Sequence, residues 1–194
     1  SVLAIWVGGV MLVAILKPHA RLEGLVDPKP HQLFFGRYFL FFVMSQIQAA
    51  VIVAGDLLVL KIQCVEPALL FATGAITSLV FSLLIYALTV SFGDVGKAVV
   101  VVVMVLQIAG SSGTFPIELL PDVYQKIYHI FPFPYAIDAV RECVCGLYGT
   151  TWLKNIGCLL IFGAAALVIG LLVRKPFMGL NHFMEEKLKE TEML

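Results

Sequence analysis

The chain has 194 residues, of which 60% are hydrophobic and only 13% are charged, and its mean hydropathy is +0.98. A soluble domain carries about 25% charged residues, so this composition excludes an ordinary water-exposed surface. The 13 basic and 13 acidic residues balance at pH 7, which leaves no global positive charge for binding nucleic acid. We therefore expect an all-α, polytopic transmembrane bundle embedded in the lipid bilayer.

The first apolar stretch covers residues 2–16. It is shorter than the roughly 20 residues that a helix needs to cross a bilayer. Neither an initiator Met nor the basic residues of a secretory signal precede it. We therefore expect residues 1–194 to form a single membrane domain, the C-terminal part of a longer protein that was cut near the start of a membrane helix.

Residues 17–37 separate this stretch from the next one and contain four basic residues and three prolines. Prolines interrupt helices, so we expect a loop here. The second apolar stretch, residues 38–60, reaches spanning length.

Three polar residues of the second stretch, Ser45, Gln48 and Asp56, share one helical face. An acidic residue within a membrane helix is a candidate functional residue, so the three are candidates for a polar lining. The alternative is that Asp56, one turn from the end of the stretch and close to Lys61, meets water or a partner.

The third and fourth apolar stretches, residues 67–92 and 98–109, are joined by a polar turn at residues 93–97. The fourth contains a β-branched run at residues 99–103, which in water would favour a strand. An open strand in lipid leaves its backbone groups unpaired, so we expect a helix that small residues extend to Gly113.

The long segment 114–151 follows and is divided by prolines. Residues 121–130 have the spacing of a short amphipathic helix, Pro132 and Pro134 end it, and residues 135–147 form a second short helix. Its many aromatic residues are typical of a membrane–water interface. We expect two short re-entrant or interfacial helices on the outer side, and a gate and a surface cap without a gating role are the two alternatives for them. The candidate gate residues are Phe115, Pro116, Pro121, Tyr135, Asp138 and Arg141.

The fifth apolar stretch, residues 152–173, completes five expected membrane helices, and a charged tail covers residues 175–194. The loop 17–37, the turn 93–97 and the tail would lie on one side of the membrane, together with nine of the 13 basic residues. Because positive residues concentrate on the cytoplasmic side, that side and the C-terminus are expected to be cytoplasmic and segment 114–151 to be outside.

The four cysteines, Cys64, Cys143, Cys145 and Cys158, are expected at or near the outer side. Cys143 and Cys145 face apart on a helix, so they are not expected to pair with each other. Free thiols and a bridge from Cys64 to the segment 114–151 both stay open, because spacing cannot choose between them. No catalytic, metal-binding or cofactor motif is present, so we expect neither an enzyme nor a cofactor.

Two runs, GSSGTFPIELLP at residues 110–121 and FPFPYAIDAVRE at residues 131–142, resemble the ABC transporter type-2 permease family. Together with GDLLVL at residues 55–60 and the EEKLKET tail, they resemble its phage-infection protein (YhgE/Pip) branch. The resemblance implies a plasma-membrane protein with six core helices, of which the five stretches correspond to the second to sixth. It implies a cytoplasmic coupling loop at residues 17–37, with the candidate residues Arg21, Glu23, Asp27 and Lys29.

The resemblance also implies a homodimer and a separate ATP-hydrolysing subunit, and a large extracellular region before residue 1. We expect the membrane-spanning permease domain of an export-type transporter. The alternative is the membrane anchor of a cell-surface receptor or scaffold, associated with phage infection or secretion, without transport of its own. An intramembrane enzyme is a weaker third alternative, because the sequence shows no nucleophile–base pair.

Overall fold

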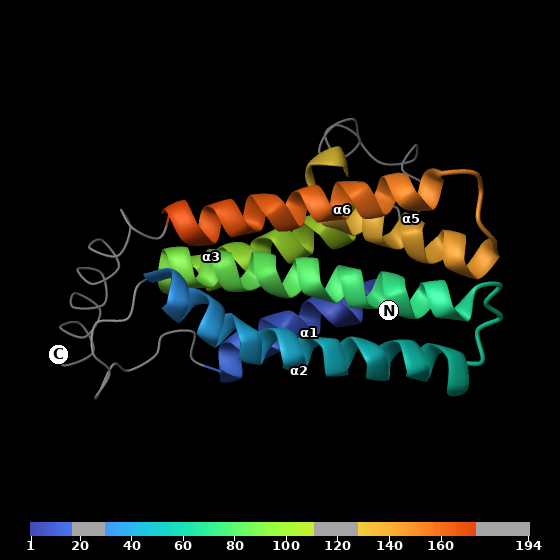
Figure 1. The fold of residues 1–194 in the computed structure, drawn as a ribbon, viewed down its shortest axis with the longest axis horizontal. Helices are drawn as coiled ribbons and strands as arrows, with labels where there is room; N and C mark the ends of the chain where they lie inside the picture. Colours follow the sequence, from blue (N-terminus) through green and yellow to red (C-terminus); the bar gives the residue numbers. More distant parts are fainter. Residues whose placement is uncertain (17–29, 111–127, 174–194) are drawn as a thin grey trace.

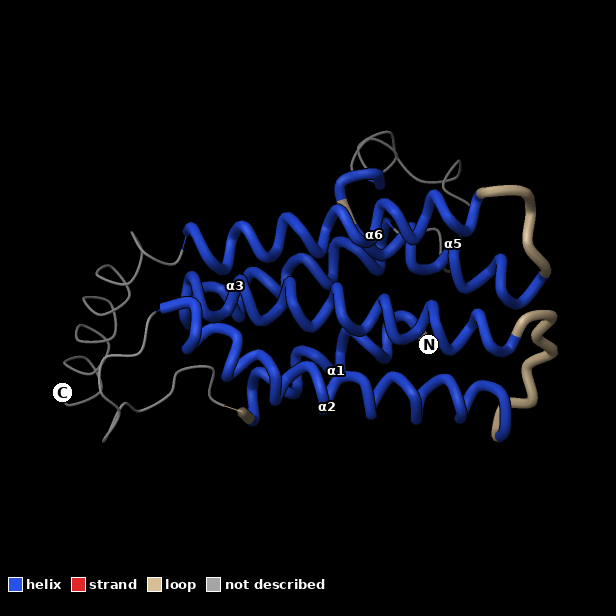
Figure 2. The backbone as a smooth tube through the Cα atoms, viewed as in Figure 1, coloured by secondary structure: helices blue, strands red, loops and turns tan. Residues whose placement is uncertain are grey.

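The computed structural model describes residues 1–16, 30–110 and 128–173, and these residues form helices without any strand. The helices lie side by side along one common axis, with the described connections at the ends (Figures 1 and 2). Their bounds in chain order are α1 (Val2–Ile15), α2 (Pro30–Leu58), α3 (Pro67–Gly110), the 3-10 turn η2 (Tyr128–Ile130), α5 (Pro132–Cys145), α6 (Thr151–Val168) and the π-helical turn η3 (Ile169–Val173). The expected all-helical fold is confirmed for the described residues.

Three helical segments are long and apolar enough to cross a bilayer: residues 34–58 of α2, 67–93 of α3 and 151–171 of α6. Two shorter apolar helices, residues 2–15 and 95–108, complete the set. The five segments coincide with the five predicted apolar stretches. Large hydrophobic side chains remain exposed along them, as a surface in contact with lipid requires.

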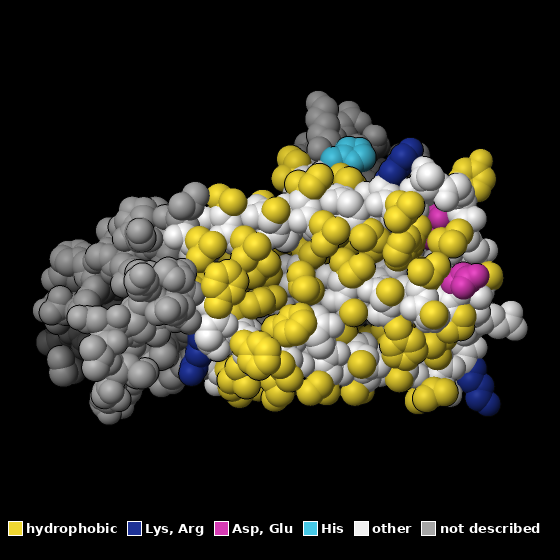
Figure 3. Space-filling view, viewed as in Figure 1, with side chains coloured by type: hydrophobic (Ala, Val, Ile, Leu, Met, Phe, Trp, Pro, Cys, Tyr) yellow, Lys and Arg dark blue, Asp and Glu magenta, His cyan; other side chains and the backbone are white. Residues whose placement is uncertain are grey.

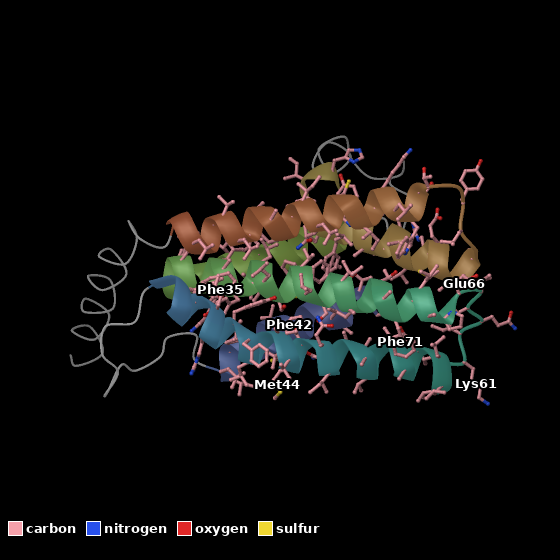
Figure 4. All side chains as sticks on the ribbon, in the orientation of Figure 1. Phe35, Phe42, Met44, Lys61, Glu66 and Phe71 are labelled. Atoms are coloured by element: carbon pink, nitrogen blue, oxygen red, sulfur yellow. The ribbon has the colours of Figure 1, made fainter. Side chains whose placement is uncertain are left out.

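On the surface of the bundle, hydrophobic and charged side chains are separated. Hydrophobic side chains cover the middle of the face drawn in Figure 3, and most charged side chains lie toward its ends. Phe35, Met44 and Phe71, labelled in Figure 4, are each more than two-fifths exposed, at 48%, 43% and 41%. Lys61 and Glu66 lie in the connection between α2 and α3, at one end of the bundle (Figure 4). We call this end, with residues 59–66, the connection end.

Helix α3 has 44 residues, which at 1.5 Å per residue would be far longer than the roughly 30 Å hydrocarbon core of a bilayer. It reverses direction at Gly93, whose φ of 60° and ψ of −132° are not helical. Its first arm (residues 67–93) and second arm (residues 95–108) therefore lie antiparallel. The predicted separation into two helices is correct, but the expected turn at residues 93–97 is confined to the region of Gly93.

Helix α2 begins at Pro30, not at the predicted residue 38. Residues 30–37 were expected to belong to the loop 17–37, and this boundary is corrected. A proline suits the first turn of a helix because it needs no N–H donor there, so Pro30 can begin α2 instead of preventing it. The rest of that loop, including Arg21, Glu23, Asp27 and Lys29, lies outside the described residues, as does the tail 175–194.

The first arm of α3 lies at the centre of the bundle and contacts α1, α2, α5 and α6. The fully buried side chains around this arm include Phe81 and Tyr86 of the arm itself, Trp6 of α1 and Phe133 of α5. Polar side chains also face inward along this arm, and Thr73, Thr77 and Ser78 are at most 1% exposed. The interior is therefore not uniformly apolar.

The reversal of α3 gives a prediction at Gly96, where a β-carbon would overlap the backbone carbonyl of Leu88. Because backbone atoms cannot move aside as a side-chain end can, Gly96→Ala should destabilise the protein by about 1–3 kcal/mol, as overpacking of a core does. Thermal unfolding in detergent measures this loss. Gly157→Ala on α6 is the matched control, because nothing lies within 4 Å of its β-carbon position. Equal melting temperatures for the two variants would contradict the close approach of the arms.

Candidate functional site

The three predicted lining residues of α2 lie at its contacts with other helices of the same chain. Ser45 is buried, and its carbonyl oxygen accepts a hydrogen bond of 2.8 Å from the Ser78 hydroxyl of α3. The Gln48 amide lies against α1, where a β-carbon at Gly8 would overlap it. An Asp56 carboxylate oxygen lies 3.9 Å from the backbone nitrogen of Ser1, at the start of α1. Their role as a polar lining stays a prediction.

Gln46 was not selected from the sequence, because it lies off the face that Ser45, Gln48 and Asp56 share. Its amide nonetheless donates a hydrogen bond of 3.1 Å to the Ala75 carbonyl of α3. The face with Ser45, Gln48 and Asp56 therefore meets both α1 and α3, and the neighbouring face at Gln46 also meets α3. The hydrophobic pattern of the second apolar stretch did not indicate the contact of Gln46, because one more polar residue hardly changes the mean hydropathy of the stretch.

Helix α5, which carries the described gate candidates, starts in the interior of the bundle. It runs from the middle of the bundle to the connection end (Figure 1). At its start the Phe133 ring stacks on Phe81 of α3 with a centroid distance of 5.3 Å. The Trp6 ring of α1 meets Phe81 at 4.9 Å and Phe133 at 5.5 Å, both edge to face. Each such aromatic pair contributes about 0.5–1.5 kcal/mol beyond its burial.

A helix that starts among apolar side chains must satisfy its free N–H groups, since no bulk water is there to do so. Pro132 and Pro134, in the first turn of α5, have no N–H at all. The N–H of Phe133, which lies between them, donates to Oε1 of Gln107 at 3.3 Å. Gln107 belongs to the second arm of α3 and is 1% exposed. The predicted second short helix therefore begins at Pro132 instead of residue 135, with these prolines in its first turn.

The other end of α5 is attached to the connection between α2 and α3. The Cys143 carbonyl accepts hydrogen bonds from the Glu66 N–H and the Cys64 thiol, both at 3.1 Å. The Val144 carbonyl accepts from the Val65 N–H at 3.4 Å. Carbonyls in the last turn of a helix have no partner within it, so the connection acts as their cap.

Thr73 of α3 joins three helices near this end. Its hydroxyl accepts a hydrogen bond of 2.9 Å from Nε1 of Trp152, at the start of α6. The same hydroxyl lies 3.3 Å from the Cys143 sulfur and donates to the Leu69 carbonyl at 2.7 Å. Neither Thr73 nor Gln107 was selected from the sequence, because a single polar residue in an apolar stretch does not show which helix it faces.

Three of the six predicted gate residues are described, and all belong to α5. The Arg141 guanidinium and the Asp138 carboxylate form an ion pair of 3.2 Å across one helical turn on the exposed side. The Tyr135 hydroxyl donates to the His129 carbonyl at 3.1 Å, and its ring lies 5.9 Å from that of Phe162 of α6. The structure thus brings Tyr135 to η2 and α6, and the Asp138–Arg141 pair to the surface. Phe115, Pro116, Pro121 and most of the first expected short helix lie outside the described residues.

All four cysteines are free thiols, and the two on α5 differ in environment. Cys143 is buried and Cys145 is exposed, so they face apart as expected. Burial raises the pKa of the Cys143 thiol above its ordinary value. A raised pKa leaves less thiolate at neutral pH, which makes Cys143 the less reactive of the two. Among residues 1–16, 30–110 and 128–173, no three His, Cys, Asp or Glu side chains gather to hold a metal ion.

Comparison with known proteins gives one family. A family model described as ABC-2 family transporter protein matches residues 4–172. The chain is also similar to the uncharacterized protein YhgE of Bacillus subtilis (strain 168), with 30% identity over 151 residues. That similarity covers 77% of this chain and 19% of YhgE, so the chain spans about a fifth of the length of this relative. No solved structure matches the chain.

The anchor at the start of α5 gives a prediction for Gln107→Leu. This change removes the acceptor of the buried Phe133 N–H, which should cost about 1–3 kcal/mol of folding free energy. Gln46→Leu is the matched control, because the Ala75 carbonyl that Gln46 contacts lies inside α3 and keeps its helical bond. Thermal unfolding in detergent should show the larger loss for Gln107→Leu. A larger loss for Gln46→Leu would contradict the role of Gln107 as the α5 anchor.

Proposed function

Since the chain belongs to the ABC-2 family of transporter proteins, we propose that it is the membrane-spanning permease domain of an export-type transporter. The membrane location follows from the family and from the apolar helices. The observation that carries the proposal is the position of α5, a short helix that starts inside the bundle. A side chain of α3 binds its start, and backbone groups of the α2–α3 connection bind its end.

In this proposal α1, α2, the two arms of α3 and α6 are five membrane helices. The connection end faces outward, and the Gly93 end and the C-terminus face the cytoplasm. The asymmetry of basic residues supports this orientation, since nine of the 13 belong to the cytoplasmic side. The short α1, with 14 residues, covers only about 21 Å of the bilayer.

Helix α5 and the segment before it form the outer gate. Polar contacts attach α5 near both of its ends: the Phe133 N–H binds Gln107 at the start, and at the other end the Cys143 and Val144 carbonyls bind residues 64–66 and the Cys143 sulfur lies against Thr73. Moving α5 would break these bonds and its packing on α3 and α6, but would leave the contacts of the spanning helices with one another in place. The Asp138–Arg141 pair and Tyr135 lie on this element, where a substrate would leave the membrane.

The energy for export would come from a separate ATP-hydrolysing subunit, and two copies of the chain would form the conduit. The loop that precedes α2, with Arg21, Glu23, Asp27 and Lys29, is the proposed contact for that subunit. Its charged residues at the cytoplasmic side suit a soluble partner. The chain itself is not proposed to be an enzyme, because its sequence has no phosphate-binding loop or nucleophile–base pair.

The orientation predicts which cysteines an impermeant maleimide can reach on intact cells. Cys145, kept as the sole cysteine, should react from outside, whereas Val95→Cys in a cysteine-free chain should react only after permeabilisation. Val95 suits this test because it is 49% exposed and lies beside the reversal of α3. A chain with Cys143 alone should react slowly in either condition, because its burial and raised pKa reduce the available thiolate. The opposite pattern for Cys145 and Val95→Cys would invert the proposed orientation.

The coupling role predicts capture of an ATP-binding subunit by photo-reactive residues at positions 21, 23, 27 and 29 of the full-length protein in native membranes. The double variant Glu23→Lys, Asp27→Lys should weaken that capture by reversing two charges. A photo-reactive residue at position 130, where Ile130 is 64% exposed beside α5, is the control and should not capture it. If only extracellular or secretion partners are captured, the chain serves as the membrane anchor of a receptor or scaffold, and the transporter proposal is wrong.

A further inference from the structure

Four polar atoms in the interior of the bundle have no hydrogen-bond partner among the described residues. They are Nε1 of Trp6, Oγ1 of Thr77, Nε2 of Gln107 and Nδ2 of Asn155. Their side chains are almost inaccessible, with Trp6 and Thr77 0% exposed, Gln107 1% and Asn155 9%. Buried polar groups nearly always bind a protein group or an ordered water, because an unpaired group in an apolar interior is costly. Four such groups in one small bundle therefore point to an occupant.

Asn155 and Thr77 lie one helical turn apart in depth. The bond between Thr73 and Trp152 joins the first arm of α3 to α6, and both helices run away from the connection end. Thr77 follows Thr73 by four residues, and Asn155 follows Trp152 by three, so each lies one helical turn deeper than the residue it follows, on the buried face of its helix. Val80 of the first arm meets Gly163 of α6, and Ala87 meets Gly170, so residues of α6 lie level with residues 83 positions earlier in α3. Asn155 is therefore close to the depth of Thr73, one turn short of Thr77.

Trp6 and Gln107 lie one further turn inward. Phe81, four residues after Thr77, packs against Trp6 and Phe133. Because Oε1 of Gln107 accepts the Phe133 N–H, its Nε2 is the end of the amide without a partner. The four groups therefore follow one another over three successive turns of the bundle, from Asn155 through Thr77 to Trp6 and Gln107, between α1, α3 and α6 and beside α5.

The face of α5 at this depth consists of small side chains. Ala136 and Ala139 are 0% exposed and lie between Phe133, which contacts Phe81, and Cys143, which contacts Thr73. They therefore face the depth of Thr77 with methyl groups that offer no polar partner. The groups that remain are donors on Trp6, Gln107 and Asn155 and a hydroxyl on Thr77.

These three donors and one hydroxyl require a bound molecule that accepts hydrogen bonds. Among the described residues no Lys, Arg, Asp or Glu is buried, so no buried opposite charge would balance an anion there. Water is neutral, accepts two hydrogen bonds and can also donate to the Thr77 hydroxyl oxygen. We propose that Trp6, Thr77, Gln107 and Asn155 form a buried water-binding site beside α5. This site goes beyond the transport proposal, since it concerns the interior of a single chain.

X-ray radiolytic labelling of the full-length protein in lipid nanodiscs tests the site, because ordered water produces hydroxyl radicals where it is bound. We expect several-fold faster modification of Trp6 and Phe133 than of Phe41 and Tyr86. The controls are equally buried aromatic residues, each 1% exposed, and the Tyr86 hydroxyl has a protein acceptor in the Phe34 carbonyl at 3.3 Å. Equal protection of all four side chains would overturn the proposal.

Conservative variants connect the label to the donors. Trp6→Phe removes Nε1–H but keeps an aromatic ring, and Thr77→Val removes the hydroxyl at nearly constant volume. Each should lower the modification of Phe133 toward the level of Phe41, whereas Tyr86→Phe should leave it unchanged. If Trp6→Phe and Thr77→Val raise the melting temperature and leave labelling of Phe133 unchanged, the groups are simply unpaired and no water binds them. If a variant fails to fold, the contrast within the wild-type protein still decides.

Discussion

Backbone N–H and C=O groups must be paired wherever lipid excludes water. This requirement is most demanding at α5. This helix starts among aromatic rings in the middle of the bundle, where no bulk water reaches its first N–H groups. Two prolines remove donors, and the Gln107 amide accepts the N–H of the residue between them. At the other end, the last carbonyls of α5 are capped from the α2–α3 connection. A short helix can therefore stand inside a membrane bundle without leaving these groups unpaired.

The reversal of α3 is what makes this anchor available. Because the chain turns at Gly93, the second arm returns along the first and brings Gln107 to the depth of Phe81. The close approach of the arms at Gly96 leaves no room for a β-carbon. One helix hairpin thus supplies a central packing surface through its first arm and the cap of α5 through its second. A change in the angle between the arms would act on the start of α5.

Buried polar side chains run along the whole first arm of α3, from Thr73 to Ser91, and the buried Asn155 of α6 lies in the half of the bundle that α5 occupies. Thr73 and Trp152 join the helices near the connection end, where Asn155 is also buried, and Thr77 follows one turn deeper. In this member of the ABC-2 family, polar groups lie behind a short helix while large hydrophobic side chains stay exposed on the outside of the bundle. The contacts of α2 with α1 and α3 serve a different purpose, since Ser45, Gln46 and Gln48 fasten spanning helices to one another.

The sequence by itself determined the membrane class, the five apolar stretches, the proline-divided segment and the family, because hydropathy and length directly reflect the thickness and dryness of a bilayer. It also indicated the second short helix, although it misplaced its start by treating Pro132 and Pro134 only as a break. The tertiary structure decided which polar residues meet. Helical periodicity assigns Ser45, Gln48 and Asp56 to one face, but it cannot say that this face packs on α1 and α3. Gln107 and Thr73 give no local pattern, since each acquires its role from a helix far away in the chain. Such pairings depend on the reversal at Gly93 and on the depth at which α5 starts, and only the folded chain fixes both.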